Sequence, residues 1–271
     1  SDPLALSDAA IADWGEMTAR LARALRSFAH PSAHRTMLWD IQHASRTRPM
    51  LADIRDPDRR AAVAEVLDRF EAVVLPAWPL LRSQCVHTDF TIDNALVDDA
   101  GRISGIVDFG DMSYSAMAVD IASVIDSLAN GRDPAELFRV SRLVLDGYQR
   151  VTPLEPLELE LMGECIATRS AVTIAIPAWR AARGLEDAEF AERYTASAET
   201  IVRTILDTGW DEVARRLGAP GRPPTSASLA TRRGAVLGPA LEPLTYEHPI
   251  HMASARGVWM TDVGGRRYLD A

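Results

Sequence analysis

Apolar side chains recur every three or four positions along most of this chain, which is the spacing of an amphipathic helix. The first such stripe follows Ser7, a residue suited to cap a helix N-terminus, and it consists of Ile11, Trp14, Met17, Leu21, Leu25 and Phe28. Arg20, Arg23 and Arg26 fall off this stripe, so we expect them to form a solvated face.

The same spacing predicts further helices along the chain. One begins at Asp56-Pro57 and stops at Pro76. The others span residues 116–129, 134–150, 155–175 and 187–217. Pro177 is expected to end or kink the helix over residues 155–175, because proline lacks the amide hydrogen that an inner helical turn requires.

Residues 84–110 have a different texture, with Val, Ile and Phe in short runs. The segment "DDAG" at 98–101 separates "NALV" from "RISGIVDF", which is typical of a turn between two strands. The pattern therefore predicts a mainly α fold that contains a small β-hairpin.

The chain changes character after residue 217. Residues 218–228, "GAPGRPPTSAS", are rich in Gly, Pro and Ser and are interpreted as part of a linker over 218–243. Near the end, "GVWMTDVGGRRYLDA" predicts two short strands around a Gly-Gly turn. Because an isolated hairpin is marginally stable in water, residues 244–271 are expected to be the truncated start of another domain, separate from the domain of residues 1–217.

Composition narrows the class of protein. The 271 residues carry a net charge of −9, which argues against nucleic acid or an anionic membrane as the main partner. No apolar run is long enough to span a membrane. The two cysteines cannot form a disulfide framework and are expected to be reduced thiols in a cytoplasmic protein. All 29 basic residues are arginines, so the sequence contains no lysine.

The candidate chemistry lies beside the predicted hairpin. Asp89 is followed by Asn94 and, after the hairpin, by Asp108. Asn94 and Asp108 could supply the oxygen ligands that Mg²⁺ prefers, which would leave Asp89 to orient a substrate hydroxyl and accept its proton. Phosphoryl transfer requires such an arrangement of a metal and a positioned base.

Each of these residues also has a structural interpretation. Asp and Asn near turns are often turn formers, and this is the preferred interpretation of Asp93, Asp98 and Asp99. His87 is expected to be a buried, hydrogen-bonded histidine. For Asp89, Asn94 and Asp108 the functional interpretation is preferred, because their order, their spacing and the hairpin agree.

Four more residues are candidates for substrate binding. Asp111 could contact the metal or a cationic substrate. Tyr114, Trp179 and Arg180 could line a substrate pocket, although Trp and Tyr more often belong to a core. For Asp111 the choice between metal and substrate stays open, and for Tyr114 and Trp179 the choice between pocket and core stays open.

The motifs "HTDFTIDN" at 87–94 and "IVDFGD" at 106–111 resemble those of the aminoglycoside phosphotransferase and choline kinase-like small-molecule kinases. The resemblance covers about residues 5–217. It implies that Asp89 is the catalytic base and that Asn94 and Asp108 hold Mg²⁺. It further implies that His87 and Asp120 support the catalytic loop. Thr88 stands where this family has Gly.

Kinases of this shape also have an N-terminal lobe, which supplies a glycine-rich loop and a lysine for the phosphates of ATP. The sequence has no glycine-rich loop before residue 87 and no lysine. We therefore expect the C-terminal lobe of a protein-kinase-like fold with its N-terminal lobe absent. The isolated chain is expected to bind Mg-ATP weakly and to show no measurable turnover.

The last residues carry a second resemblance. "GVWMTDVGGRRYLD" is similar to the opening strands of class III, pyridoxal-phosphate-dependent aminotransferases. Pyridoxal phosphate needs a lysine for its Schiff base, so this cofactor would bind only in a part of the parent protein beyond this sequence. The resemblance implies a kinase-like domain and an aminotransferase domain fused in one parent chain.

Three function classes remain open. The first is a Mg-ATP-dependent kinase for the hydroxyl of a small molecule, and the fusion favours an amino alcohol, because a pyridoxal-phosphate enzyme could expel the phosphate thus installed. The second is an accessory domain of a class III aminotransferase, either a 4-aminobutyrate-type transaminase or a phospho-lyase. The third is a non-catalytic kinase relic, against which the intact Asp, Asn and Asp set argues.

Overall fold

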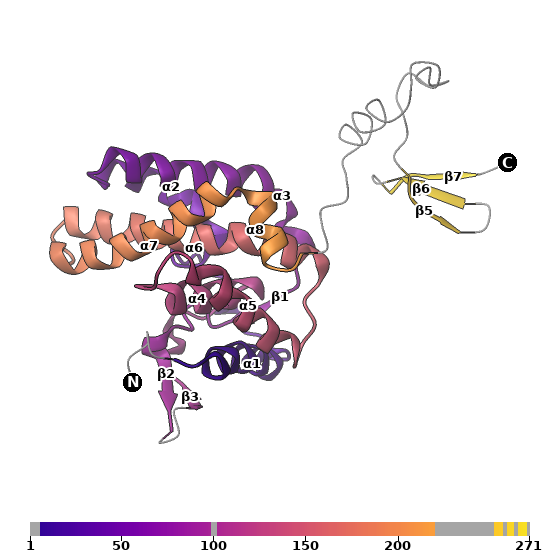
Figure 1. Cartoon of the computed structure of the whole chain (residues 1–271), viewed down its shortest axis with the longest axis horizontal. Coiled ribbons are helices and arrows are strands. Elements are labelled where there is room, and N and C mark those ends of the chain that lie inside the picture. The colour runs from indigo at the N-terminus through magenta and orange to yellow at the C-terminus, as the bar shows by residue number, and fades with distance from the viewer. Residues whose placement is uncertain (1–5, 99–101, 220–251, 257–258, 263–264, 270–271) are drawn as a thin grey trace, which may run out of the picture. The chain divides into compact units, whose positions relative to one another are not determined.

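The computed structural model describes residues 6–98, 102–219, 252–256, 259–262 and 265–269. The chain divides into two compact units, residues 1–221 and residues 222–271. The first unit is mainly helical and contains two small antiparallel sheets (Figure 1). The prediction of a mainly α fold with a small hairpin is confirmed for this unit, whereas the absence of an N-terminal lobe stays a prediction.

The first helix, α1 (Asp8–Leu25), begins where the sequence predicts, because the Ser7 side chain accepts a hydrogen bond of 3.2 Å from the amide of Ala10. Its apolar face is buried, and Arg20, Arg23 and Arg26 are exposed, as expected. Phe28 lies beyond the helix and is also exposed.

Helix α1 packs on α5 (Glu136–Gln149) at a glycine contact. A Cβ atom at Gly15 would lie 1.9 Å from the carbonyl oxygen of Val144, and one at Gly147 would lie 1.9 Å from that of Ala12. The two helix backbones therefore approach so closely that only glycine fits at these positions.

Helix α2 (Pro57–Arg69) is capped by Asp56, whose side chain accepts hydrogen bonds from two amides. The prediction that this helix stops at Pro76 is wrong, because the helical path continues to Leu80. It continues as a π turn, η4 (Phe70–Val74), then as α3 (Leu75–Ala77) and as the 3-10 turn η5 (Trp78–Leu80). The change of hydrogen-bond register before Pro76 accommodates a residue that has no amide hydrogen.

The later helices are α4 (Ala118–Ala129), α6 (Pro156–Ala182), α7 (Ala188–Thr208) and α8 (Trp210–Arg216). The predicted helix over 187–217 is split, because Gly209 adopts a φ of 80° between α7 and α8. Of the two outcomes expected at Pro177, an end or a kink, the end does not occur, since α6 continues to Ala182. All residues at 161–177 are buried, and α6 lies among α2, α4 and α7 (Figure 1), so tertiary packing outweighs the local cost of proline.

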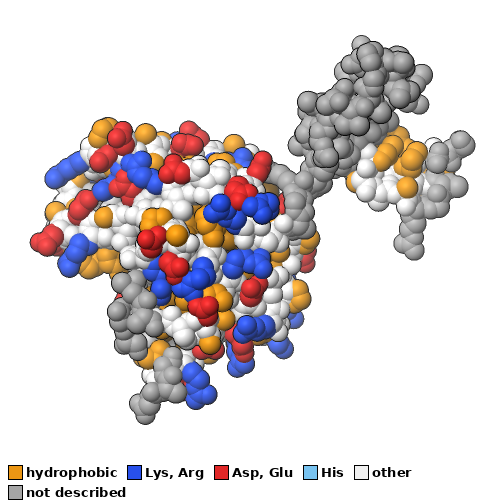
Figure 2. Space-filling model, in the orientation of Figure 1, with side chains coloured by type: hydrophobic (Ala, Val, Ile, Leu, Met, Phe, Trp, Pro, Cys, Tyr) orange, Lys and Arg blue, Asp and Glu red, His pale blue; other side chains and the backbone are white. Residues whose placement is uncertain are grey.

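Ion pairs join α2 to α7. The Arg59 guanidinium lies 2.6 Å from Glu199 and 2.8 Å from Glu192. Figure 2 shows arginine and acidic side chains interspersed over the visible face of this unit. These pairs fix α7, which forms one wall of the candidate site described below.

Two sheets frame the central motifs. The predicted hairpin consists of β2 (Ala95–Val97) and β3 (Ile103–Ile106), while its turn at 99–101 lies outside the described residues. Strands β1 (Ser83–Val86) and β4 (Ser113–Ala116) form a second antiparallel pair that sequence analysis missed. It also missed two 3-10 segments, η2 (Pro31–Ala33) and η3 (Ile41–Asp53).

The second unit contains an antiparallel sheet of β5 (Met252–Arg256), β6 (Trp259–Asp262) and β7 (Arg267–Leu269). Strands β6 and β7 are the two that the sequence predicts, and Gly265 between them has a φ of 80°. Strand β5 was not predicted. Most of the proposed linker at 218–243 lies outside the described residues. No helix in the described part of the chain is long and apolar enough to cross a membrane.

Candidate active site

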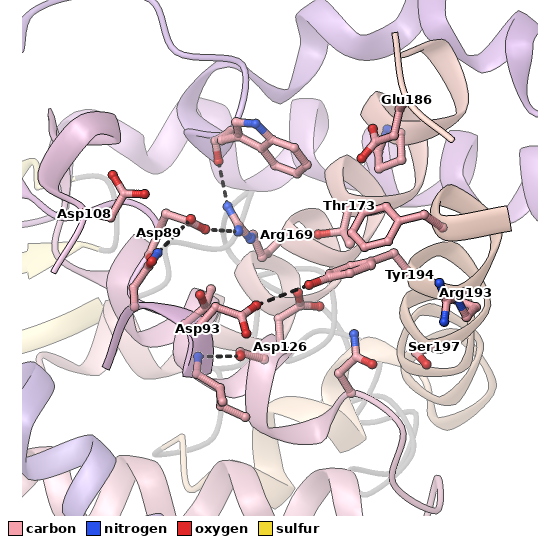
Figure 3. Close-up of a pocket in the computed structure, with 18 of the residues that line it drawn as sticks. Asp89, Asp93, Asp108, Asp126, Arg169, Thr173, Glu186, Arg193, Tyr194 and Ser197 are labelled. Atoms are coloured by element: carbon pink, nitrogen blue, oxygen red, sulfur yellow. Dashed lines mark hydrogen bonds and ion pairs between the residues drawn. The ribbon is translucent and has the colours of Figure 1, made fainter. Parts of the chain in front are cut away.

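A pocket of about 750 Å³ opens beside the motif of residues 87–94 (Figure 3), and Asp89, Asn94 and Asp108 all line it. The hairpin brings the last two together, because Asn94 directly precedes β2 and Asp108 follows β3. The amide of Val107 donates a hydrogen bond of 3.0 Å to the carbonyl of Asn94, which closes the base of the hairpin. The convergence that the sequence spacing predicts is therefore present, while the chemical roles of the three residues stay predictions.

Asp120, in the first turn of α4, holds the loop that carries Asp89. Its carboxylate accepts hydrogen bonds from the backbone amides of His87, at 3.1 Å, and of Thr88, at 2.7 Å. The side chain is fully buried, and burial raises the pKa of Asp120 while the two amides oppose that rise. These contacts are of the kind that the family resemblance implies for Asp120, whose role in a catalytic loop stays a prediction.

Thr88 adopts a φ of 73°, in the left-handed region that a β-branched residue rarely occupies. Its hydroxyl lies 3.0 Å from that of Ser113, and its carbonyl accepts a hydrogen bond of 2.9 Å from Ser123. Ser113 and Ser115 in turn each donate a hydrogen bond of 2.8 Å to buried Asp40. A buried polar network thus holds Thr88 in a conformation for which glycine is the ordinary choice.

His87 is buried and connects the two motifs. Its Nε2 atom lies 3.0 Å from the carbonyl oxygen of Val107. Its ring centroid lies 4.7 Å from that of Phe109. These contacts tie the loop before Asp89 to the segment that carries Asp108, which fits a bracing role for His87.

Both carboxylate oxygens of Asp89 are engaged. Oδ1 accepts a hydrogen bond of 2.7 Å from Arg169 on α6, and Oδ2 accepts one of 3.1 Å from the side-chain amide of Asn94. The same Asn94 nitrogen donates at 2.8 Å to the carbonyl of Asp89. The orientation of the Asp89 carboxylate is therefore fixed from two sides.

Arg169 was not predicted from the sequence. Its guanidinium donates to the carbonyl of Trp39 at 3.2 Å and lies 5.3 Å from the centroid of the Trp39 ring. Arg169 is only 5% exposed. One signal could have revealed it, because an arginine inside the apolar run "CIATRSAVTIAI" needs a buried partner.

Asp108 has a φ of 60°, and its side chain accepts a hydrogen bond of 3.3 Å from the amide of Gly110 at the start of the turn η7 (Phe109–Asp111). Arg35 braces this turn by donating to the carbonyls of Gly110 and Met112. Asp111 is half-buried and is not among the residues that line the pocket. Burial raises the pKa of Asp111, and the negative charge of Asp89 raises it further.

The side-chain oxygens of Asn94 and Asp108 fit a magnesium ion that arrives with a nucleotide. Among the described residues there is no group of three or more His, Cys, Asp or Glu side chains suited to a metal. Mg²⁺ is usually held by one or two carboxylates together with phosphate oxygens and water. The Asn94 nitrogen is engaged by Asp89, so the Asn94 amide oxygen and the Asp108 carboxylate would be the two protein ligands.

The residues proposed for substrate binding are not brought together. Arg180 lines the pocket and lies 3.2 Å from Glu186. Trp179 packs against the core beneath the guanidinium of Arg183, and Tyr114 is exposed with its ring 4.6 Å from that of His34. Neither Trp179 nor Tyr114 is among the lining residues, because both rings are used in these other contacts.

Sequence analysis also missed much of the pocket wall. Asp126 on α4 is 5% exposed and accepts a hydrogen bond from Ser170. Asp93, interpreted as a turn former, lines the pocket and accepts a hydrogen bond of 3.3 Å from the hydroxyl of Tyr194. Helix α7 contributes the rest of this wall, namely Phe190, Arg193, Tyr194 and Ser197.

The chain is similar to several small-molecule kinases. A hydroxylysine kinase of Mus musculus is 25% identical over 232 residues, which is 78% of this chain and 61% of that protein. A homoserine kinase of Paramagnetospirillum magneticum is 34% identical over 121 residues, which is 42% of this chain and 36% of that protein. The chain thus spans about three fifths of the length of the first relative.

A solved structure, described as that of a microcompartment-associated aminopropanol kinase, shares the fold. Its TM-score is 0.59 at 16% identity, and the match covers 78% of this chain and 65% of that one. The family model of the phosphotransferase enzyme family matches residues 2–154, which include every residue that the motifs single out at 87–120. Because this match covers more than half of the chain, the protein belongs to the phosphotransferase enzyme family.

Proposed function

We propose that the protein transfers the terminal phosphoryl group of ATP to the hydroxyl group of a small amino alcohol. The observation that carries this proposal is that Asp89, Asn94 and Asp108 line one pocket beside a loop braced by Asp120. Membership of the phosphotransferase family supports the reaction class. The names of the hydroxylysine, homoserine and aminopropanol kinases support an acceptor that carries both an amine and a hydroxyl.

In this proposal Asp89 is the base. The acceptor oxygen forms the new bond to the terminal phosphorus, the bond to the bridging oxygen breaks as ADP leaves, and the hydroxyl proton passes to Asp89. Each carboxylate oxygen has two lone pairs, so the hydrogen bonds from Arg169 and Asn94 leave room for the acceptor hydroxyl. Asp89 therefore both positions the hydroxyl for in-line transfer and accepts its proton.

Asn94 and Asp108 would hold Mg²⁺, which when bound supplies the charge that neutralises the phosphate oxygens. His87 and Asp120 keep the two motifs in register through the backbone contacts described above. Thr88 takes the place of a glycine at the sharpest point of the loop. In this scheme these three residues act by position and do not touch the reacting atoms.

The acids of the pocket wall supply a reason for an amine-bearing acceptor. Asp126 lines the pocket from α4, and Asp93 lines it from the turn η6 (Ile92–Asn94), which directly precedes β2. Burial raises the pKa of Asp126, while the positive charge of Arg169 opposes that rise. An ammonium group bound beside Asp93 and Asp126 would add a second positive charge to this acidic wall.

The other sequence interpretations keep the status of predictions. These are the division into residues 1–217, 218–243 and 244–271, the aminotransferase domain with its pyridoxal phosphate, and the inactivity of the isolated chain. The antiparallel sheet of β5, β6 and β7 is common to many folds, so it does not favour an aminotransferase over other classes.

The proposal is tested by offering a panel of acceptors to the full-length protein with Mg-ATP. The panel contains amino alcohols, hydroxylated amino acids, choline, aminoglycosides and amine-free diols. Mass spectrometry of the acceptors is expected to show a phosphate on members of the first two classes. Phosphate on the amine-free diols alone, or on none of the acceptors, would contradict the proposed function.

A further inference from the structure

Most charges that line the pocket pair with one another. Arg169 lies 2.7 Å from Asp89, and Arg180 lies 3.2 Å from Glu186. Asp108 belongs to the proposed metal site. These pairs account for the lining charges except for Asp93, Asp126 and Arg193.

Arg193 is a pocket-lining cation on α7, next to Tyr194 (Figure 3). Within the described part of the chain no hydrogen bond, ion pair or ring contact engages its guanidinium. The other arginines of the lining each have a carboxylate partner within the pocket. Arg193 is thus placed to bind an anion that enters the pocket, and a planar guanidinium suits a carboxylate in particular.

The two remaining acids are held by hydroxyl groups, and the charge of Arg169 also acts on Asp126. Asp93 accepts a hydrogen bond of 3.3 Å from the Tyr194 hydroxyl, and Asp126 accepts one from Ser170. Neither carboxylate forms an ion pair with any described residue. Asp126 is buried and Asp93 is exposed, so Asp126 is the carboxylate whose desolvation a bound cation would offset.

Tyr194 connects α7, the helix that carries Arg193, to Asp93. It follows Arg193 on α7, and its hydroxyl reaches across the pocket to Asp93 on the catalytic loop. Figure 3 shows Asp93, Asp126 and Tyr194 directed toward a common space, with Arg193 on the far side of Tyr194 from Asp93. An acceptor lying along this wall would meet negative charge at one end and positive charge at the other.

We propose that the acceptor binds as a zwitterion, with its ammonium group against Asp93 and Asp126 and its carboxylate against Arg193. The acceptor class is then a hydroxylated amino acid rather than an amino alcohol without a carboxylate. This inference rests on the proposed phosphotransfer and narrows its substrate.

The test compares acceptors that differ by one charged group. Serine, homoserine and hydroxylysine are each offered to the full-length protein with Mg-ATP, beside the decarboxylated analogue and the deaminated analogue of each. The proteins are the wild type, Arg193→Gln and the control Arg203→Gln. Arg203 is a half-exposed arginine on the same helix, paired with Glu199 at 2.6 Å and outside the pocket lining.

The wild type is expected to prefer the best amino acid over its decarboxylated analogue by about tenfold or more in kcat/KM, the effect of one hydrogen bond to a charged group. Arg193→Gln should remove that preference by raising KM for the amino acid, with kcat/KM for the decarboxylated analogue unchanged within about threefold. Arg203→Gln should keep the wild-type preference.

Two outcomes would overturn the inference while leaving the phosphotransfer intact. One is a wild type that phosphorylates the decarboxylated amino alcohols as well as the amino acids. The other is an Arg193→Gln variant that loses activity equally toward both. If no acceptor gains phosphate from the wild type, the proposed function itself fails, and the inference fails with it.

Discussion

The backbone amide of Thr88 lies 2.7 Å from Oδ1 of Asp120, although Thr88 has a φ of 73°. This bond keeps a β-branched residue in the left-handed region immediately before Asp89. The loop is therefore fixed by a buried carboxylate more than by the intrinsic preference of its own residues.

Substitution of Thr88 tests this balance. Thr88→Gly relieves strain of about 1–2 kcal/mol but loses a hydrogen bond of about 1 kcal/mol and adds backbone entropy to the unfolded state. We expect the free energy of unfolding to change by less than about 1 kcal/mol. Thr88→Val keeps the strain and loses the hydroxyl contact to Ser113, so it should destabilise by about 1–3 kcal/mol. Urea unfolding of both variants provides the measurement. An equal loss of unfolding free energy in the two variants would contradict the strain at Thr88.

Asp120→Ala should be more damaging than either Thr88 variant. It removes the acceptor of two buried amides, those of His87 and Thr88. An unsatisfied buried donor costs about 1–3 kcal/mol, so a loss of about 3 kcal/mol or more is expected together with loss of activity. A stable and fully active Asp120→Ala variant would show that the loop does not depend on this carboxylate.

Arg169 is expected to position Asp89. Arg169→Met removes the hydrogen bond to Oδ1 and the positive charge beside Asp89 and Asp126. A misplaced catalytic group costs about a hundredfold in rate, so kcat should fall by about that factor while KM for ATP changes little. Arg169→Lys, which restores the charge alone, should recover part of the loss. If both variants keep wild-type kcat, Arg169 has no part in orienting the base.

The contact between α1 and α5 should tolerate no side chain. A methyl group at Gly147 would lie 1.9 Å from the carbonyl oxygen of Ala12. Because that atom belongs to the backbone and cannot move aside, Gly147→Ala should destabilise by about 3 kcal/mol or more. Gly105→Ala is the control, since its nearest neighbour at 3.3 Å is the flexible side chain of Leu96. Thermal unfolding distinguishes the two variants, and similar melting temperatures would contradict the close approach.

Acid should weaken the link between α2 and α7. Hydrogen bonds from Arg59 lower the pKa of Glu192 in the folded state, so the unfolded state binds more protons in acid. The contribution of this pair is present above the ordinary glutamate pKa of about 4.3 and is lost as the pH falls through the lowered value. Arg59→Gln should therefore reduce the melting temperature at neutral pH and reduce it less in acid. A difference that is constant with pH would contradict this linkage.

Local sequence signals predicted the helices and the hairpin well. Ser7 and Asp56 cap helices where expected, and the predicted strands between Asn94 and Asp108 pair as β2 and β3. Pro177 could not be predicted in the same way, because the packing around α6 decides whether its helix continues.

The site was predictable only where its residues are close in sequence or belong to a motif. Asp89, Asn94 and Asp108 share two short motifs. Arg169 is 80 residues from its partner Asp89, and Tyr194 is 101 residues from Asp93. Such pairs depend on how α6 and α7 pack against the loop. The packing of α7 also brings Tyr194 to Asp93, a contact that the local sequence around Asp93 cannot reveal.

The central claim is that Asp89 acts as the base of a phosphotransferase site. Its most direct test is the kcat of Asp89→Asn with an acceptor that the wild type phosphorylates. Asparagine keeps the shape and can still be held by the loop, but it cannot accept the proton. The account predicts a loss in kcat of about a thousandfold, within the range of general-base catalysis, with KM for ATP within about threefold. A kcat within tenfold of the wild type would contradict it.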